Sequence, residues 1–341
     1  MMKNKCFVFV SLLSLLLSSC GNSKNRISLF LYDYKDDFIS EFNESFNEIF
    51  NKEYDLKTYY ASNSQKNQNE SILEELNNSN SKFFVINLVD RTSGNAIIKK
   101  CKSKNVPVVF FNRRPLSNDL IYDNSNFLYV GSDPKNEGDL QADIINDYFI
   151  NFDNFKENFD KNKNGKLDVI LIKGERSHQD AEIRNLAVIN TLTLFGYDIN
   201  IISSSYCDWS REKSNDYFKS IYDEYKNDID LVISNNDSMA LGVSDYLKTL
   251  EYDKEKKLYE EFFPIVGIDG TKEGIEASKN GDLIGTVKND AKEEAKAIYE
   301  VIKYTLNNKD FSSFPYEIDD NFILIKGYKI EFFNESNVKE E

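Results

Sequence analysis

The sequence predicts an α/β protein with two similar halves, each a parallel sheet covered by helices. Its 341 residues are enough for two domains of ordinary size. Strand-like apolar runs alternate with longer helical patterns, which is typical of parallel sheets with crossover helices. The runs form two series that meet near Gly131-Ser132-Asp133. The expected strands are 27–32, 83–87, 106–111 and 127–130 in the first series, and 167–172, 199–203, 231–234 and 265–268 in the second.

Helices are expected between these strands, for example at 37–50, 137–150, 180–193 and 239–250. A polar insertion at 153–166 interrupts the second half.

Composition limits the classes of function. Hydrophobic residues make up 40% of the chain, so a sizeable core is available. The formal net charge of −15 argues against nucleic acid as a partner, because binding phosphates needs clustered Lys and Arg. It also argues against electrostatic docking to an anionic membrane.

The N-terminus has the pattern of an export signal. Lys3 and Lys5 precede an apolar stretch at 7–17, which is too short to be a comfortable membrane-spanning helix. Leu17-Ser-Ser-Cys20 resembles a bacterial lipobox, which implies cleavage before Cys20 and attachment of lipid to that residue. We therefore expect a lipoprotein signal peptide at 1–20, a linker at 21–26, and a periplasmic or cell-surface protein held to the membrane by lipid alone. An uncleaved anchor or an ordinary signal peptide is the alternative.

Cysteine and histidine offer little for metal or nucleophilic chemistry. Once Cys6 and Cys20 are assigned to the signal peptide and the anchor, Cys101 and Cys207 remain, and both are expected to be free thiols. His178 is the single histidine of the chain. Zinc sites and histidine-based triads therefore lack their usual residues.

One segment has the spacing of a calcium loop. In Asp160-Lys-Asn162-Lys-Asn164-Gly165-Lys166-Leu-Asp168, oxygen-bearing side chains stand at positions 1, 3, 5 and 9, and glycine stands at position 6. This is the first part of an EF-hand loop, whose glycine permits the sharp bend and whose position 7 supplies a carbonyl. Leu171 occupies position 12, so the last carboxylate would have to come from a distant part of the chain. A polar turn without a metal is the simpler alternative.

Polar side chains also follow the ends of the predicted strands. In open α/β sheets, ligands bind at the carboxyl ends of the strands. Those ends carry side chains that suit a polyol: Tyr34, Asp36 and Asp37; Asn112-Arg113-Arg114; His178, Asp180 and Arg184; Asn235-Asn236-Asp237; Asp269; and Asn289-Asp290. Asp36 could instead be a helix cap.

These motifs resemble, in order, those of the periplasmic galactose/glucose-binding proteins. The resemblance extends from about residue 26 to about 331. It is carried by the following segments: Tyr32-x-Tyr34-x-Asp36-x-Phe38, Asn87-Leu-Val-Asp90, Asn105-Val-Pro-Val-Val-Phe-Phe-Asn112, Tyr129-Val-Gly131, His178-x-Asp180-Ala-Glu-x-Arg184, Asn235-Asn-Asp-x-Met-Ala240, Gly267-x-Asp269 and Gly285-Thr-Val-x-Asn-Asp-Ala291.

The resemblance implies two three-layer α/β/α lobes with parallel sheets, joined by a three-stranded hinge, with the ligand cleft between them. The N-terminal lobe would comprise 27–131 plus 289–325. The C-terminal lobe would comprise 132–288 plus 326–341 and would carry the calcium-like loop 160–168. The crossings should lie near Gly131, Lys288 and Ile325.

The resemblance also implies the site residues. Sugar hydroxyls would be bound by Asp36, Asn112, His178, Asp180, Arg184, Asn236, Asp269 and Asn289, and the ring would lie between Phe38 and Trp209. Trp209 aligns only with a one-residue gap. Carboxylates, amides and a guanidinium can satisfy hydroxyls that both donate and accept, and aromatic rings cover the apolar faces of a pyranose.

For calcium, the resemblance implies a structural Ca²⁺ held by Asp160, Asn162, Asn164, the Lys166 carbonyl, Asp168 and the remote Asp230. Asn164 stands where aspartate is usual in the family, and Asp230 stands where glutamate is usual. Both departures reduce the charge or reach of the ligand set.

The function expected from this resemblance is a monomeric, non-catalytic receptor that binds D-galactose or D-glucose and delivers it to an ABC permease, with a chemoreceptor as a further candidate partner. A secreted glycoside hydrolase is the main alternative, because Asp36, Asp180 and Asp269 offer carboxylates near a sugar. A receptor for another monosaccharide is also open. A sugar-responsive repressor is disfavoured, since no basic helix-turn-helix precedes Ile27.

Overall fold

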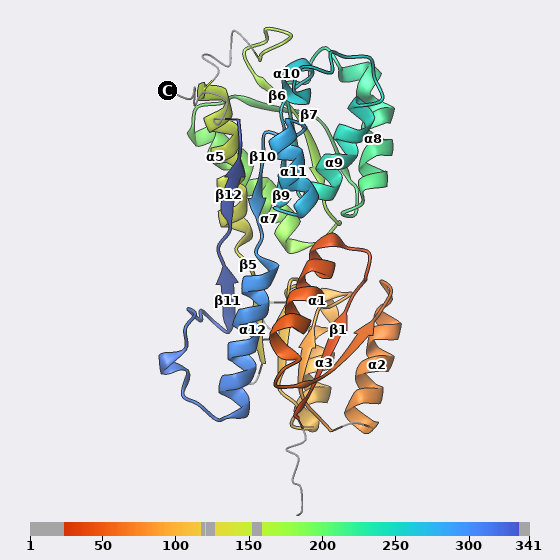
Figure 1. Cartoon of the computed structure of the whole chain (residues 1–341), viewed down its shortest axis with the longest axis vertical. Coiled ribbons are helices and arrows are strands. Elements are labelled where there is room, and N and C mark those ends of the chain that lie inside the picture. Colours follow the sequence, from red (N-terminus) through yellow and green to blue (C-terminus); the bar gives the residue numbers. More distant parts are fainter. Residues whose placement is uncertain (1–23, 79, 117–119, 121–126, 152–158, 334–341) are drawn as a thin grey trace, which may run out of the picture.

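The computed structural model describes residues 24–78, 80–116, 120, 127–151 and 159–333. These residues form two lobes, one above the other in Figure 1. The predicted signal peptide, with Cys20, lies outside the described residues. Among the helices that are described, none is long and apolar enough to cross a membrane.

The first lobe, in the lower half of Figure 1, has a parallel sheet in the order β11-β5-β4-β3-β1-β2. Its strands are β1 (Arg26–Leu31), β2 (Asp55–Tyr60), β3 (Ser81–Ile86), β4 (Val108–Phe111), β5 (Phe127–Ser132) and β11 (Phe322–Ile325). Its helices are α1 (Asp37–Phe50), α2 (Gln65–Asn78), α3 (Gly94–Ser103) and α12 (Ala291–Leu306), with short 3₁₀ turns η1 (Arg91–Ser93) and η2 (Phe311–Ser313).

Successive residues of β1 bury both faces of this sheet. Leu29 and Leu31 pack with residues of α1 and α12 on one face, whereas Phe30 packs with residues of α2 and α3 on the other. A sheet that is covered on both faces needs continuous apolar strands, which explains the unbroken runs in the sequence.

The second lobe has a sheet in the order β12-β10-β9-β8-β6-β7. Its strands are β6 (Leu167–Lys173), β7 (Ile199–Tyr206), β8 (Leu231–Ser234), β9 (Ile265–Asp269), β10 (Gly285–Lys288) and β12 (Tyr328–Glu331). Its helices are α5 (Pro134–Asn151), α7 (Gln179–Leu194), α8 (Arg211–Tyr225), α9 (Asp237–Leu247), α10 (Leu258–Glu261) and α11 (Lys272–Asn280). Val169 packs toward α5 and α7, and its neighbour Ile170 packs toward α8 and α9.

Three connections between the lobes are described, on one side of the molecule in Figure 1: β5 to α5, β10 to α12, and β11 to β12. The predicted fold class, two α/β lobes with parallel sheets and helices on both faces, is confirmed. One strand departs from the parallel pattern, because β12 runs antiparallel to β10.

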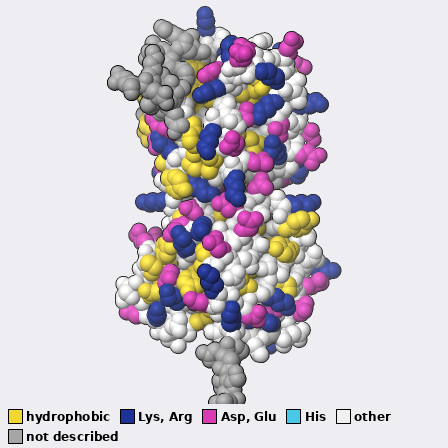
Figure 2. Space-filling model, viewed as in Figure 1, with side chains coloured by type: hydrophobic (Ala, Val, Ile, Leu, Met, Phe, Trp, Pro, Cys, Tyr) yellow, Lys and Arg dark blue, Asp and Glu magenta, His cyan; other side chains and the backbone are white. Residues whose placement is uncertain are grey.

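The two lobes also meet directly through side chains. Arg113 of the first lobe forms an ion pair with Glu175 of the second at 2.6 Å. Lys288 at the end of β10 forms another with Glu41 of α1 at 2.7 Å. The lobes are therefore closed on each other. On the face shown in Figure 2, basic and acidic side chains are interspersed over both lobes, and no broad basic surface is present there.

Candidate ligand-binding site

A cavity between the lobes brings together all ten residues predicted to contact a sugar. Two further residues line it with them, Tyr32 and Arg113. The ten predicted residues are Asp36, Phe38, Asn112, His178, Asp180, Arg184, Trp209, Asn236, Asp269 and Asn289.

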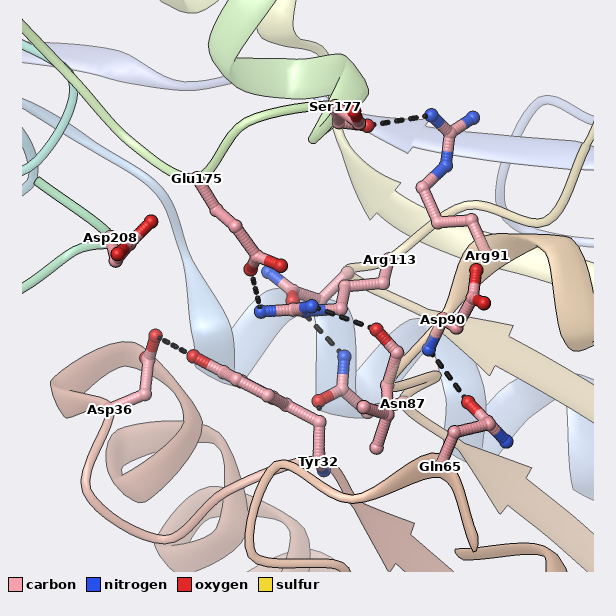
Figure 3. Close-up of polar contacts among 12 residues, drawn as sticks. Tyr32, Asp36, Gln65, Asn87, Asp90, Arg91, Arg113, Glu175, Ser177 and Asp208 are labelled. Atoms are coloured by element: carbon pink, nitrogen blue, oxygen red, sulfur yellow. Dashed lines mark hydrogen bonds and ion pairs between the residues drawn. The ribbon is translucent and has the colours of Figure 1, made fainter. Parts of the chain in front are cut away.

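The first lobe contributes residues that follow β1 and β4. Asp36 caps α1, since its Oδ1 accepts the backbone N–H of Ile39 at 2.9 Å. Its Oδ2 accepts a hydrogen bond from the Tyr32 hydroxyl at 2.7 Å, as Figure 3 shows. Asp36 is therefore both a cap and a lining residue of the cavity. Phe38, two residues later, belongs to the hydrophobic core of the first lobe and also lines the cavity.

The second lobe contributes the start of α7. His178 is the residue before this helix, but its side chain makes no capping hydrogen bond. Arg184, one and a half turns into the helix, is held by Glu137 at 2.7 Å from its Nε and by the Asn235 carbonyl at 3.0 Å from its Nη1. These contacts fix the guanidinium before any ligand binds.

Trp209 lies directly over a glycine. A Cβ at Gly174 would come within 2.2 Å of the Trp209 ring, so only glycine allows this close packing. The His178 ring meets Trp209 edge-on, with centroids 5.0 Å apart. The aromatic wall of the second lobe is thus fixed by its neighbours.

The backbone is left-handed at three residues that line the cavity: Asn112 (φ 57°), Trp209 (φ 61°) and Asp269 (φ 109°). Such conformations cost energy in residues other than glycine, and they concentrate at functional sites.

Burial shifts the pKa values of the ionisable groups. Burial raises the pKa of Asp180 to about 6, although the Arg184 charge acts in the opposite direction. Burial also raises the pKa of Asp269 well above its usual range. For His178, burial and then the charges of Arg113 and Arg184 lower the pKa well below 6.5. The imidazole is therefore neutral at pH 7, and it can donate through one nitrogen and accept through the other.

Several polar atoms in the cavity lack partners among the described residues. His178 Nδ1, Asn289 Oδ1 and Arg113 Nε are buried without a hydrogen bond. The carboxylates of Asp180 and Asp269 accept no hydrogen bond from any described residue, although both side chains are more than nine-tenths buried. Buried polar groups are normally paired, so this wall is suited to a ligand that brings its own donors and acceptors.

Tyr32 and Arg113 were not among the ten predicted sugar contacts, although Arg113 was one of the polar side chains expected at the strand ends. Tyr32 was only part of a matched motif, and Arg113 follows the predicted ligand Asn112 directly. The adjacency of Arg113 to Asn112 was the available signal. Both residues also line a larger groove of about 860 Å³, which continues from the cavity toward solvent.

The predicted calcium loop forms the turn before β6, with Gly165 at φ 79° as the spacing requires. Its oxygen atoms already accept hydrogen bonds within the protein. Asp160 accepts the backbone N–H groups of Asn164 (3.1 Å) and Gly165 (2.8 Å). Asp230 reaches the loop from 62 residues away and accepts the N–H of Asp168 at 2.8 Å.

The loop has suitable oxygen ligands, but the oxygen atoms of its two amides are not directed at the Asp168 carboxylate. Asn162 and Asn164 each direct their amide NH₂ groups at Asp168 Oδ2, at 2.7 Å. Among the described residues, no group of three or more His, Cys, Asp or Glu side chains is placed to hold a metal. Calcium would fit only if both amides turned their oxygen atoms inward. The Lys166 carbonyl completes the predicted set.

Two hinged α/β lobes that close over a polar cavity with unpaired donors and acceptors define a ligand-binding protein of the two-lobed type. The comparison with family models identifies which one. Residues 27–310 match the model of the periplasmic binding protein domain, so the chain belongs to this family. As predicted, it is a binding protein and not an enzyme.

One relative covers most of the chain. The D-galactose/methyl-galactoside binding periplasmic protein MglB of Haemophilus influenzae is 33% identical over 308 residues, which is 88% of each chain. A xylitol-binding protein of Mycolicibacterium smegmatis is 26% identical over 44% of this chain and 41% of its own length.

Solved structures share the fold at lower identity. A solute-binding protein of an ABC transporter from Actinobacillus succinogenes, with bound D-allose, superposes with a TM-score of 0.74 at 18% identity, covering 90% of this chain and 98% of that one. A solute-binding protein from Bacillus halodurans, with bound myo-inositol, gives a TM-score of 0.72 at 19% identity, covering 91% and 96%.

Proposed function

We propose that this protein is an exported receptor that binds D-galactose or D-glucose between its lobes and delivers it to an ABC permease. The single observation that carries the proposal is the cavity lined by all ten residues that the galactose/glucose-binding pattern predicts. The 33% identity to a D-galactose/methyl-galactoside binding protein supports the same class of ligand.

The chemistry of the cavity suits a pyranose. Asp180, Asp269 and Asn289 present acceptors that lack partners among the described residues, and each hexose hydroxyl can donate to one of them. Hydrogen bonds to ionised groups are the stronger kind. Phe38 from the first lobe and Trp209 from the second provide aromatic surfaces for the apolar faces of the ring.

Binding and lobe closure are coupled in this proposal. The lining residues come from both lobes, so a sugar can make its full set of contacts only in the closed form. The ligand then shifts the population toward closure, by as much as its affinity for the closed form exceeds that for the open form. The closed form is what the permease would recognise.

Calorimetric titration of the purified protein with glucose, galactose and, as a control, myo-inositol tests the proposal. We expect one-to-one binding in the micromolar range or tighter for at least one of the two hexoses. A folded protein that binds neither hexose would contradict it. Preference for myo-inositol or another polyol would support instead a receptor for a different ligand, such as those bound in structural neighbours.

We further propose that loop 160–168 and Asp230 bind a structural Ca²⁺. The carboxylates of Asp160, Asp168 and Asp230 influence one another, since burial and then these two neighbouring charges raise the pKa of Asp230 to about 7. A divalent cation would offset that repulsion and replace the N–H donors that now surround the oxygen atoms.

Export and anchoring complete the proposal. Cys20 in its lipobox-like setting would carry the lipid and anchor the protein to a membrane as a periplasmic or cell-surface lipoprotein. Mass spectrometry of the N-terminal peptide from the native host is expected to show a lipidated Cys20, and Cys20→Ser should release the protein from membranes. A chemoreceptor stays a second candidate partner.

A further inference from the structure

Arg113 is one of the polar residues at the strand ends, but it is not among the ten predicted sugar contacts. It directly follows Asn112 at the end of β4, lines the cavity and is 3% exposed. Its guanidinium carbon lies 3.7 Å from the centroid of the Tyr32 ring, within cation–π distance. Through Tyr32, whose hydroxyl donates to Asp36, it is connected to a predicted sugar ligand.

Each nitrogen of this guanidinium has a different environment. Nη1 donates to the Val89 carbonyl at 3.0 Å, which belongs to the same lobe. Nη2 donates to Glu175 Oε2 at 2.6 Å, which belongs to the opposite lobe (Figure 3). Nε is buried and has no acceptor among the described residues.

These three environments suggest two roles that depend on each other. A buried N–H without an acceptor carries a desolvation cost that a ligand oxygen in the same cavity would remove. The Glu175 pair forms only when the lobes meet. Its Arg113 side chain is 4% exposed and its Glu175 side chain 35%, so solvent screens this pair less than an exposed surface pair.

We propose that Arg113 couples ligand binding to lobe closure: its Nε–H donates to the sugar, while its Nη2 pairs with Glu175 across the mouth of the cleft. This inference rests on the proposed sugar-receptor function and adds to it a contact residue and a closing contact. Glu175 acts as a positioning residue, which touches Arg113 and not the ligand.

Two other arginines of the first lobe also make contacts with the second lobe. Arg91 Nη1 donates to the Ser177 carbonyl at 3.4 Å, and Arg114 Nε donates to Gln179 at 3.0 Å. Neither arginine lines the cavity between the lobes. Arg113 therefore differs from its neighbours in reaching both the opposite lobe and the proposed ligand space.

The test is a double-mutant cycle of sugar affinity, measured by calorimetry, together with the radius of gyration from small-angle X-ray scattering during a sugar titration. Glu175→Gln removes the cross-lobe charge pair alone, and we expect Kd to rise about fivefold. Arg113→Met replaces the guanidinium with an apolar chain and removes both roles together with the cation–π contact to Tyr32, and we expect Kd to rise about 30-fold or more. The double variant should be no weaker than Arg113→Met alone.

The scattering curve distinguishes closure from a merely structural effect. In Glu175→Gln, compaction should need a proportionally higher sugar concentration, with the same compact end state. Asp55→Asn is the matched control, because it breaks an ion pair with Arg26 that lies wholly within the first lobe. It should leave affinity and compaction unchanged.

Arg113→Lys keeps the inference testable if Arg113→Met does not fold. Lysine can still pair with Glu175 but lacks the Nε–H, so we expect a loss between those of the other two variants. If the wild type binds sugar and both Arg113→Met and Arg113→Lys bind it with the same affinity, the inference is overturned but the receptor function stands. Absence of sugar binding by the wild type would overturn both.

Discussion

The interlobe cavity and the calcium-like loop were both predicted from the sequence, yet they differ in how their polar atoms are satisfied. In the cavity, the carboxylates of Asp180 and Asp269 and the Nδ1 atom of His178 have no hydrogen-bond partner among the described residues. In the loop, Asp160 and Asp230 accept backbone N–H groups. Polar groups without partners favour the binding of a ligand. Groups that already accept hydrogen bonds must give up those bonds before they can bind an ion.

Without a ligand, the cavity and the loop contribute differently to the stability of the protein. Buried groups without partners lower stability, and binding recovers that cost. The loop holds itself together by its own hydrogen bonds, so an ion would add stability to a turn that is already formed. Substitutions should therefore affect affinity in the cavity and thermal stability in the loop.

The largest effect is expected from Asp180→Asn. It removes an ionised acceptor, and charged hydrogen bonds contribute about 1.5–3 kcal/mol each, so Kd should rise at least about 100-fold if the carboxylate makes two of them. Calorimetry measures this change. Asp139→Asn, which alters a carboxylate paired with Lys135 on α5, should leave Kd unchanged.

Asp180→Asn should also change thermal stability, and in the opposite direction: it should stabilise the ligand-free protein while it weakens sugar binding. Burial raises the pKa of Asp180 to about 6 from 3.8, so in the wild type its ionisation destabilises the ligand-free fold increasingly as pH rises from about 3.8 to about 6, and fully above that. Asp180→Asn should therefore melt higher than the wild type at pH 7 and about equally at the acid end of this window. A lower melting temperature at pH 7 would show that Asp180 has a structural partner.

A smaller loss is expected from Trp209→Ala. Aromatic contacts of this kind contribute on the order of 1 kcal/mol beyond the area they bury, so Kd should rise at least about tenfold. Trp209→Phe keeps a ring over Gly174 and should lose less. Equal affinity in the alanine variant and the wild type would exclude Trp209 as a sugar contact.

Local patterns predicted the buried parts of the fold well. Runs such as Leu29 to Leu31 identify β1, because both faces of that sheet are covered. They did not identify β2, an edge strand with an exposed, polar sequence at Asp55–Tyr60. Its position depends on pairing with β1, which composition does not reveal.

The site shows the same limit. Asn112 and Asp36 lie at the ends of strands, where ligand residues are expected, and the structure brings them to one cavity. Arg113 is distinguished by its ion pair with Glu175, 62 residues later and in the other lobe. Only the arrangement of the closed lobes makes that contact visible.

Sugar affinity is expected to change several-fold with pH. Burial in the closed form lowers the pKa of His178 well below 6.5. Below about pH 6.5, closure should therefore require a protonated His178 to release its proton, which opposes binding. Wild-type affinity should then weaken several-fold between pH 7.5 and pH 5.5. His178→Gln cannot be protonated and should lose this part of the pH dependence. Identical pH profiles for the two proteins would contradict a role for His178 in the closed site.

The smallest effect is expected in the loop. If Ca²⁺ is present at about 100 times its Kd, it adds about 2.7 kcal/mol to the free energy of unfolding, or roughly 5–10 °C in melting temperature for a lobe of this size. Asp230→Asn should lose at least half of the difference in melting temperature between calcium and chelator.

The melting temperature in chelator is a separate baseline, because Asp230 accepts two backbone N–H groups and amide substitution alters those contacts without any metal. Asp223→Asn, which alters a surface carboxylate paired with Lys226 and lies outside the predicted ligand set, should keep the full difference. Equal calcium-dependent shifts in the wild type and Asp230→Asn would remove the remote carboxylate from the site, and no shift in either would mean that the turn is held by its own hydrogen bonds alone.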